Sequence, residues 1–353
     1  MLDEDQVRQE YAPPDSDASL EEYLSRPTDG TIRVLGQLTG DLLVLGAGGK
    51  MGFSLCAMAR RSLDAAGHPR RRVIAVSRFG DTAVSARFRE AGIDTISCDL
   101  MADGALESLP EAPHVLYLAG MKFGSSGAPG TTWARNTFLP GLVARRFREA
   151  RIVALSTGNV YAFSDPHSGG AKEDDVLAPV GEYAQSCLGR ERMFTYFSEQ
   201  HGTTTVLIRL NYANDLRYGV VVDIARTILR GQPVNVTMGY VNVIWQGDAD
   251  AAILQSFAHC ASPPAILNVC GPETVSVRQV ARRLATLLGT PDPTFAGTEA
   301  PTALLSNSSR QQALFGPPHV PLDLLLQWTT AWLQRGGRTL EKPTGFQSRD
   351  GKF

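Results

Sequence analysis

The sequence is poor in cysteine, in net charge and in long hydrophobic runs. Its five cysteines are scattered, with no C-x-x-C pair and no Cys/His cluster at metal-ligand spacing. This excludes a disulfide framework and a zinc site, so no metal is expected. The net charge of −2 is too small to attract nucleic acid or an anionic membrane. No apolar run approaches the roughly 18 residues that a membrane span needs.

The first 38 residues differ in composition from the rest of the chain. They are polar, are interrupted by prolines, and lack the apolar segment of a secretory signal at the start. We therefore expect a soluble, cytoplasmic protein. Residues 1–38 are interpreted as an N-terminal extension with one short helix at 19–26. This extension either covers the main domain or lies at an oligomer interface, and a homodimer is one of the assemblies considered.

From Asp41 onward, short apolar strands alternate with helical segments. Runs of Val, Ile and Leu without polar alternation predict strands that are covered on both faces, and strand–helix alternation predicts a parallel sheet. The fold class is therefore α/β, a Rossmann-type doubly wound parallel sheet. The expected strands lie at 41–48, 72–78, 94–100, 114–120, 151–157, 204–210 and 265–271, and the main helices at 52–65, 81–91, 132–149, 182–200 and 219–230.

A glycine-rich loop joins the first expected strand to a helix. Gly46 permits a tight turn, Gly49 lets the backbone approach a pyrophosphate, and Gly52 allows close packing of helix and strand. The exposed N–H groups and the positive helix end would bind the phosphates. Gly48, Lys50 and Met51 complete the loop, which predicts a dinucleotide site.

The end of the second strand indicates which dinucleotide binds. Sites for NAD usually place an acidic residue there to bind the ribose 2′-hydroxyl. This chain has Ser77 and Arg78 instead, which suit a 2′-phosphate and favour NADP over NAD. An alternative is that Arg78 stacks on the adenine and makes no choice. Asp99 and Leu100, at the end of the third strand, are suitably placed to contact the adenine.

At this point the chain resembles the extended short-chain dehydrogenase/reductases, in particular the NAD-dependent epimerase/dehydratase family. The resemblance runs from about Asp41 to about Trp332. It is carried by the three spaced glycines, by "VLYLAGMKFG" (115–124), by "WARNTFLPGL" (133–142), by "ALSTGNVYAF" (154–163) and by "GEYAQSCLGRE" (181–191). The resemblance implies a cofactor site that includes Ala119, Gly120, Lys122 and Asn136. It also implies Thr157 and Tyr183 as catalytic residues, with Tyr183 contacting the cofactor.

Three departures from the family pattern bear on the chemistry. Cys187 stands where the family has a lysine, four residues after the tyrosine. Gly158 and Asn159 follow Thr157, where the sugar-nucleotide dehydratases have an Asp-Glu pair. The segment 238–250 lacks the arginine that many relatives use to bind a nucleotide-sugar diphosphate. Nucleotide sugars are therefore less expected as substrates than the family name suggests. Asn159, His167 and Asn211 are predicted to face the substrate.

The missing lysine needs a substitute, because an unperturbed tyrosine has a pKa near about 10. An adjacent ammonium lowers such a pKa by about 1–3 units in comparable pairs. Lys122 could supply a cation to the ribose, Arg190 lies on the same helical face as Tyr183, and an oxidised nicotinamide is itself cationic. Cys187 is interpreted as a small buried filler rather than a nucleophile.

The sequence supports two hypotheses about function. In the first, the protein is an NAD(P)-dependent epimerase or oxidoreductase that acts at a hydroxyl-bearing carbon of a sugar or sugar-acid-like molecule. In the second, it is a non-catalytic sensor that binds NAD(P) on the same fold. The Thr157/Tyr183 pair favours the first and Cys187 the second. The domains are predicted at 39–210, a Rossmann domain completed by about 240–271, and at 211–239 with 272–353, a small substrate-binding domain.

Overall fold

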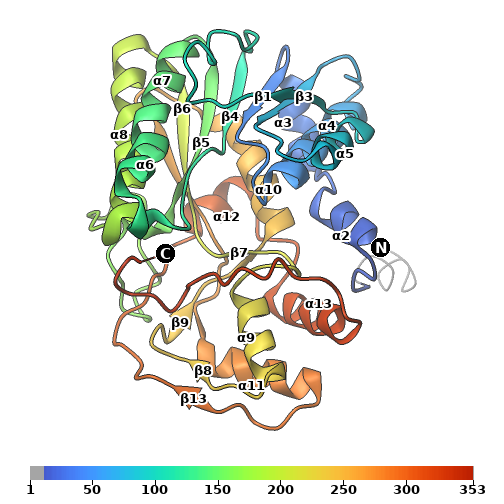
Figure 1. The fold of residues 1–353 in the computed structure, drawn as a ribbon, viewed down its shortest axis with the longest axis vertical. Coiled ribbons are helices and arrows are strands. Elements are labelled where there is room, and N and C mark those ends of the chain that lie inside the picture. Colours follow the sequence, from blue (N-terminus) through green and yellow to red (C-terminus); the bar gives the residue numbers. More distant parts are fainter. Residues whose placement is uncertain (1–11, 353) are drawn as a thin grey trace.

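The computed structural model describes residues 12–352, which form a main lobe built on one parallel sheet and a smaller lobe next to it (Figure 1). The strands are short, apolar and buried in the sheet centre, and all neighbouring pairs are parallel. In spatial order they are β11 (Ala265–Val269), β6 (Thr205–Leu210), β5 (Arg151–Thr157), β4 (His114–Tyr117), β1 (Leu42–Leu45), β2 (Val73–Ser77) and β3 (Asp94–Ser97). The order reverses at β1, and each predicted strand is found. The predicted α/β doubly wound sheet is therefore confirmed.

Helices cover both faces of this sheet, which explains why the strands lack polar alternation. On one face α7 and α8 pack over a core that includes Val143 and Phe194. On the other face α3, α4 and α10 enclose a core that includes Leu55 and Ile253. The helices of this lobe are α3 (Asp29–Gln37), α4 (Gly52–Ala65), α5 (Thr82–Glu90), α6 (Pro129–Trp133), α7 (Leu139–Arg146), α8 (Gly181–His201), α10 (Gln246–Gln255) and α12 (Ser309–Phe315).

The predicted continuous helix at 132–149 is divided in the structure. A π-helical turn at Ala134–Phe138 separates α6 from α7, and the helix ends at Arg146. The π turn brings the Asn136 side chain inward, where it donates to and accepts from the backbone of Met121. A buried polar side chain with a local backbone partner explains this departure from regular helix, which an apolar pattern does not reveal.

The smaller lobe has its own hydrophobic core, lined by Leu216, Ile224, Leu284 and Trp328 among others. Three amphipathic helices and short strand pairs build it. They are α9 (Val220–Leu229), α11 (Val277–Leu288) and α13 (Leu322–Gln334), with β8 (Val234–Asn235) beside β13 (Phe295–Ala296), β9 (Tyr240–Val241) beside β12 (Val275–Ser276), and β7 (Ala213–Asn214) beside β10 (Ile244–Trp245).

The N-terminal extension is part of the fold from residue 12 onward, while residues 1–11 lie outside the described residues. The predicted helix at 19–26 is α2 (Asp17–Leu24), which begins at a Ser16 capping box. Residues 27–38, expected to be irregular, contain α3, which begins at a second capping box on Thr28. The two buried leucines of α2 belong to the core of the smaller lobe, whereas α3 packs against α4 and α10 in the core of the main lobe.

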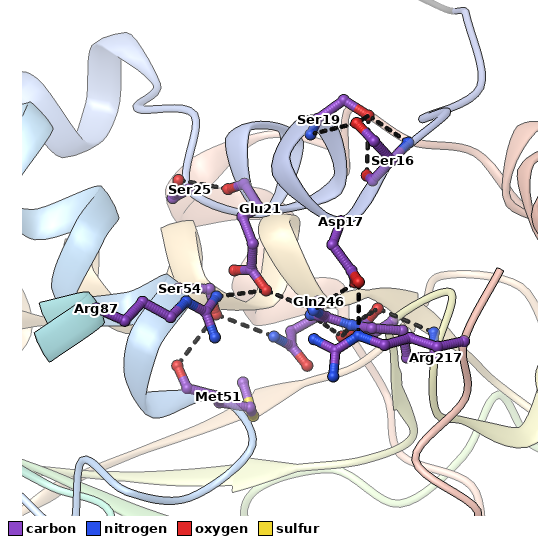
Figure 2. A network of polar contacts seen from close by, with 12 residues as sticks. Ser16, Asp17, Ser19, Glu21, Ser25, Met51, Ser54, Arg87, Arg217 and Gln246 are labelled. Atoms are coloured by element: carbon purple, nitrogen blue, oxygen red, sulfur yellow. Dashed lines mark hydrogen bonds and ion pairs between the residues drawn. The ribbon is translucent and has the colours of Figure 1, made fainter. Parts of the chain in front are cut away.

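An ion-pair network below α2 joins the two lobes (Figure 2). The Glu21 carboxylate pairs with Arg87 of the main lobe at 2.6 Å and with Arg217 of the smaller lobe at 2.5 Å. The Arg217 guanidinium also pairs with Asp215, and both of their side chains are at most 7% exposed. Through Arg217 the extension braces the segment that leads into α9.

None of the helices in residues 12–352 combines the length and the hydrophobicity needed to cross a membrane.

Candidate active site

Two connected pockets lie at the carboxyl ends of the parallel strands, between the sheet and the smaller lobe. The inner pocket, about 300 Å³, contains Thr157 and Tyr183. The outer pocket, about 560 Å³, runs past the ends of β2 and β3. The two share Gly46, Gly49 and Lys122 in their walls. An extended ligand can therefore occupy both at once, at the crevice where parallel sheets of this type bind their ligands.

The space around each glycine of the loop shows whether a pyrophosphate could approach it. A Cβ on Gly46, whose φ is +90°, would lie 2.6 Å from the Ala119 backbone nitrogen. A Cβ on Gly52 would overlap the Ala47 carbonyl, and one on Gly48 would overlap the Ser77 hydroxyl. A Cβ on Gly49 would meet only the Gly46 carbonyl oxygen, at 3.6 Å, so the space beyond it is open to the pocket. The protein packs against three of these glycines and leaves the fourth facing the cavity, as a dinucleotide cradle requires.

The outer pocket brings together the residues predicted to bind the adenosine end, which are Ser77, Arg78, Asp99 and Leu100. Ala119, predicted as part of the cofactor site, lines it as well. The Arg78 side chain is exposed, and its backbone carbonyl accepts a hydrogen bond from Ser97 at 3.0 Å. Because no acidic residue ends β2, a 2′-phosphate would meet Ser77 and Arg78 without a facing carboxylate on that strand.

Thr157 and Tyr183 line the inner pocket, and the Tyr183 hydroxyl is hydrogen-bonded to the side chains of Thr157 and of the buried Cys187. Burial raises the pKa of Tyr183 well above its ordinary value, and the Cys187 thiol adds to this. The positive charge of Arg190 and a hydrogen bond with Thr157 act in the opposite direction but do not outweigh burial. The Cys187 side chain is fully buried, and burial raises its pKa as well. The thiol is therefore a poor nucleophile, and the phenol stays protonated at neutral pH.

Arg190 is the buried cation whose charge acts on this tyrosine. Its Nη1 donates to the Leu155 carbonyl at 2.6 Å and its Nη2 to Asn136 Oδ1 at 3.0 Å. A Cβ on Gly120 would lie 2.4 Å from Nη2, so this glycine makes room for the guanidinium. Both Gly120 and Arg190 line the inner pocket. Asn136, in contrast, lines neither pocket, because its amide is engaged by Met121, Ser186 and Arg190.

Two lysines place positive charge at the junction of the pockets. Lys50 lies with its Nζ 2.9 Å from the centre of the Tyr218 ring. The residue as a whole is exposed, and its ammonium is covered on one side by that ring. Burial, then repulsion from Lys122 and Lys342, lowers the pKa of Lys50 to about 7. Burial likewise lowers the pKa of Lys122 to about 8. The Lys122 ammonium donates to the Thr344 carbonyl at 3.2 Å.

The residues predicted to face the substrate differ in their positions. Asn159 and Asn211 line the inner pocket. Asn159 donates to Thr157 Oγ1 at 2.9 Å, and Asn211 donates to Asn242 Oδ1 at 3.0 Å. His167 does not reach either pocket. It lies on an exposed turn, and the centre of its ring is 6.5 Å from that of the Tyr240 ring. The Asp165 carboxylate accepts a hydrogen bond from the His167 backbone N–H and so closes this turn outside the site.

Several pocket residues were missed from the sequence. Tyr212, Tyr218 and Gln246 line the inner pocket from the smaller lobe and the start of α10. Thr344 also lines it, although it lies 187 positions after Thr157 in the chain. Lys342 lines the outer pocket. The glycine that follows Tyr218 and precedes an apolar helix could have indicated that Tyr218 lies at the site. No local pattern marks Lys342 or Thr344 as pocket residues.

The comparisons with known proteins agree with this architecture. The model of the NAD-dependent epimerase/dehydratase family matches residues 42–238, more than half of the chain. No curated protein is similar enough in sequence to match. Among solved structures, MoeE5 in complex with UDP-glucose and NAD is similar at 22% identity, with a TM-score of 0.67 over 84% of this chain and 99% of that one. UDP-glucuronic acid 4-epimerase from Bacillus cereus, solved as a mutant with NAD and a fluorinated substrate analogue, has a TM-score of 0.69 at 16% identity, over 84% and 99%. A dTDP-glucose 4,6-dehydratase from Bacillus anthracis in complex with NAD has a TM-score of 0.70 at 15% identity, over 84% and 97%.

The fold and the glycine cradle together define a dinucleotide-binding enzyme of the Rossmann type. The chain belongs to the NAD-dependent epimerase/dehydratase family. The predicted family resemblance and the expectation of an NAD-dependent enzyme are confirmed at this level. In the described residues, no group of three or more His, Cys, Asp or Glu side chains is arranged to hold a metal ion.

Proposed function

We propose that the protein uses NADP, or less favourably NAD, to exchange a hydride at a hydroxyl-bearing carbon of a sugar or sugar-acid-like substrate. The observation that carries the proposal is that one cavity joins the glycine cradle to the paired hydroxyls of Thr157 and Tyr183. The outcome is either epimerisation of that carbon or its net oxidation or reduction.

Each residue of the inner pocket has a role in this proposal. The glycine loop and Lys122 would bind the dinucleotide, whose nicotinamide would supply the hydride chemistry. Tyr183 exchanges the proton with the substrate oxygen, and Thr157 donates a hydrogen bond to that oxygen. Asn159 holds Thr157 through a 2.9 Å hydrogen bond. Arg190 takes over part of the electrostatic role of the absent lysine, since its charge lowers the pKa of Tyr183.

The raised pKa of Tyr183 bears on which proton transfer the free protein is prepared for. A phenol that is protonated at neutral pH can donate a proton to the oxygen of a carbonyl that is being reduced. Removing a proton from a hydroxyl requires the phenolate, which is scarce until the pH approaches the raised pKa. A general acid or base of this kind contributes about 10²–10⁴-fold to the rate.

NADP is proposed over NAD because Ser77 and Arg78 line the outer pocket where β2 ends. A charge-assisted hydrogen bond from Arg78 to the 2′-phosphate would be worth about 1.5–3 kcal/mol.

The experiment combines a substrate panel with one hydroxyl deletion. Wild type and Tyr183→Phe are incubated with NAD(P) and with free, acidic and nucleotide-linked sugars. Reduced cofactor is followed by absorbance and isomerised product by NMR. We expect Tyr183→Phe to lower turnover by about 10²-fold or more, while its cofactor affinity stays near that of wild type. Tyr196→Phe, an exposed tyrosine on the same helix, serves as the control and should keep full turnover. Equal turnover in wild type and Tyr183→Phe would contradict the proposal, and binding without turnover of any substrate would favour the sensor hypothesis.

A further inference from the structure

The last segment of the chain crosses the opening between the two lobes. After α13 ends at Gln334, residues 339–352, which we call the C-terminal strap, run from the smaller lobe across the middle of the molecule toward the start of α8 (Figure 1). Two of its residues enter pocket walls, Lys342 in the outer pocket and Thr344 in the inner pocket. The strap therefore adds to a site otherwise built from residues far earlier in the chain.

The strap is attached to the smaller lobe along its length. The Leu340 backbone N–H donates to the Arg217 carbonyl at 2.9 Å. The backbone N–H and hydroxyl of Thr344 both donate to Asp223 Oδ2 at 2.7 Å. Phe346 is 8% exposed in the core of that lobe, and Arg349 donates to the Thr302 carbonyl at 2.6 Å. These contacts define one position for the strap.

Its contacts with the main lobe lie at the inner pocket and at the start of α8. Lys122 donates to the Thr344 carbonyl, and Gly351 meets Gly181, where a Cβ on Gly181 would lie 2.5 Å from the Gly351 carbonyl oxygen. Gly181 begins α8, the helix that carries Tyr183. The strap thus joins the smaller lobe to the catalytic helix across the mouth of the site, by a small number of polar and backbone contacts.

Three lysines from three segments line the two connected pockets along this path: Lys50 the inner pocket, Lys342 the outer pocket, and Lys122 both. Lys50 comes from the glycine loop, Lys122 from the loop after β4, and Lys342 from the strap. Lys50 feels repulsion from both of the others. Neither Lys50 nor Lys342 forms an ion pair with a carboxylate in residues 12–352. Asp223 is the acid whose negative charge raises the pKa of Lys50 the most. Its carboxylate already accepts two hydrogen bonds from Thr344. Like charges around an open cavity are relieved by an anion that binds among them.

We propose that the strap is the outer wall of the dinucleotide site, with Lys342 joining Lys50 and Lys122 in binding the phosphates. Lys342 shares the outer pocket with Gly48 and Gly49, the part of the loop that a pyrophosphate approaches. With the strap in place the dinucleotide is held between the loop and Lys342, so exchange of one cofactor for another requires release of the strap. The inference rests on the dinucleotide binding of the proposed function and is independent of the role of Tyr183.

The first test measures binding of ADP-ribose, which carries the pyrophosphate, and of adenosine, which carries no phosphate. Lys342→Glu should weaken ADP-ribose binding by about tenfold and leave adenosine unchanged. Lys352→Glu is the matched control, since it reverses the same charge on an exposed strap residue outside both pockets. Calorimetry with both ligands gives the comparison, and circular dichroism melting verifies that both variants fold.

The second test measures exchange and strap protection without any turnover. Bound NADPH is chased with excess NADP in a stopped-flow fluorimeter, and hydrogen exchange of residues 340–352 is followed with and without ADP-ribose. We expect Lys342→Glu to release NADPH about tenfold faster, and ADP-ribose to slow exchange in the wild-type strap.

Three results separate the explanations. If wild type binds neither dinucleotide nor ADP-ribose, the proposed function itself is wrong. If it binds them and Lys342→Glu behaves like Lys352→Glu, only the strap inference is overturned. If ADP-ribose affinity is unchanged while the KM of an anionic substrate rises, the lysines bind the substrate's anion, and the assignment to the cofactor is overturned.

Discussion

Two groups of charged side chains lie on either side of Thr157, and they differ in how their charges are balanced. Behind Thr157, Glu191 and Arg209 form a buried pair at 2.8 Å, with side chains that are 4% and 3% exposed. In front of it, Lys50, Lys122 and Lys342 bring like charges to the edge of an open cavity. The pair is complete within the protein, whereas the lysines gain from an anion supplied by a ligand.

The buried pair satisfies every polar group that it brings inside. The Glu191 carboxylate accepts from Ser156 at 2.5 Å as well as from two nitrogens of Arg209. The remaining Arg209 nitrogen donates to the Tyr161 hydroxyl and to the Glu173 carbonyl. Burial raises the pKa of Tyr161 to about 12, although the charge of Arg209 acts in the opposite direction. Because Ser156 is the residue before Thr157, the network holds the end of β5 in place. We assign it to structure, although Glu191 lies on α8, the helix that also carries Tyr183.

The largest expected effect comes from breaking the buried pair. Glu191→Ala leaves the Arg209 charge buried without its partner and should lower the free energy of unfolding by about 3–5 kcal/mol. Chemical denaturation measures this, and Glu199→Ala, an exposed glutamate on the same helix, should change it by less than about 0.5 kcal/mol. Replacing both partners, by Glu191→Leu with Arg209→Met, should recover much of the loss. A Glu191→Ala protein of wild-type stability would show that the pair does not hold the fold.

An intermediate effect is expected at the outer pocket, where the charge of Arg78 is proposed to bind the ligand. Arg78→Ala should weaken NADP binding by about tenfold to a hundredfold and leave stability nearly unchanged, the reverse of the Glu191 result. Calorimetry with NADP and NAD makes the measurement, with Arg89→Ala on the following helix as the control. An equal loss of affinity for both dinucleotides would mean that Arg78 stacks on adenine and does not select the 2′-phosphate.

The smallest effect is the pH dependence of phosphate binding. Partial burial lowers the pKa of Lys50 to about 7 and that of Lys122 to about 8, so both are charged below those values in the free protein. An anion binds the charged form, and its affinity must therefore fall as the pH rises through this range. We expect ADP-ribose to bind about fivefold to tenfold more weakly at about pH 9 than at about pH 6.5. The Lys50→Met variant should bind ADP-ribose more weakly than wild type at low pH, and its affinity should depend less on pH. Affinity that rises with pH would contradict the assignment.

Local features of the sequence were sufficient for the sheet and the glycine loop. Strand runs such as 151–157 are apolar because both faces are covered, and the three spaced glycines follow directly from backbone geometry at a strand–helix turn. The catalytic roles of Thr157 and Tyr183 were predicted only through the resemblance to the family, and the structure brings both residues into the inner pocket. The strand runs and the glycine loop, in contrast, are properties of neighbouring residues, which a sequence displays directly.

Tertiary structure alone decided how the charges meet. Arg190 was one of several proposed substitutes for the missing lysine, but only packing determined that it is buried against Gly120 and bound to Asn136. The same packing turned Asn136 away from the pockets, and His167 stayed outside because its turn closes on Asp165. Lys342 joins Lys50 across 292 positions of sequence. The interaction of two charges depends on their distance and their hydration, and neither is defined until the chain has folded.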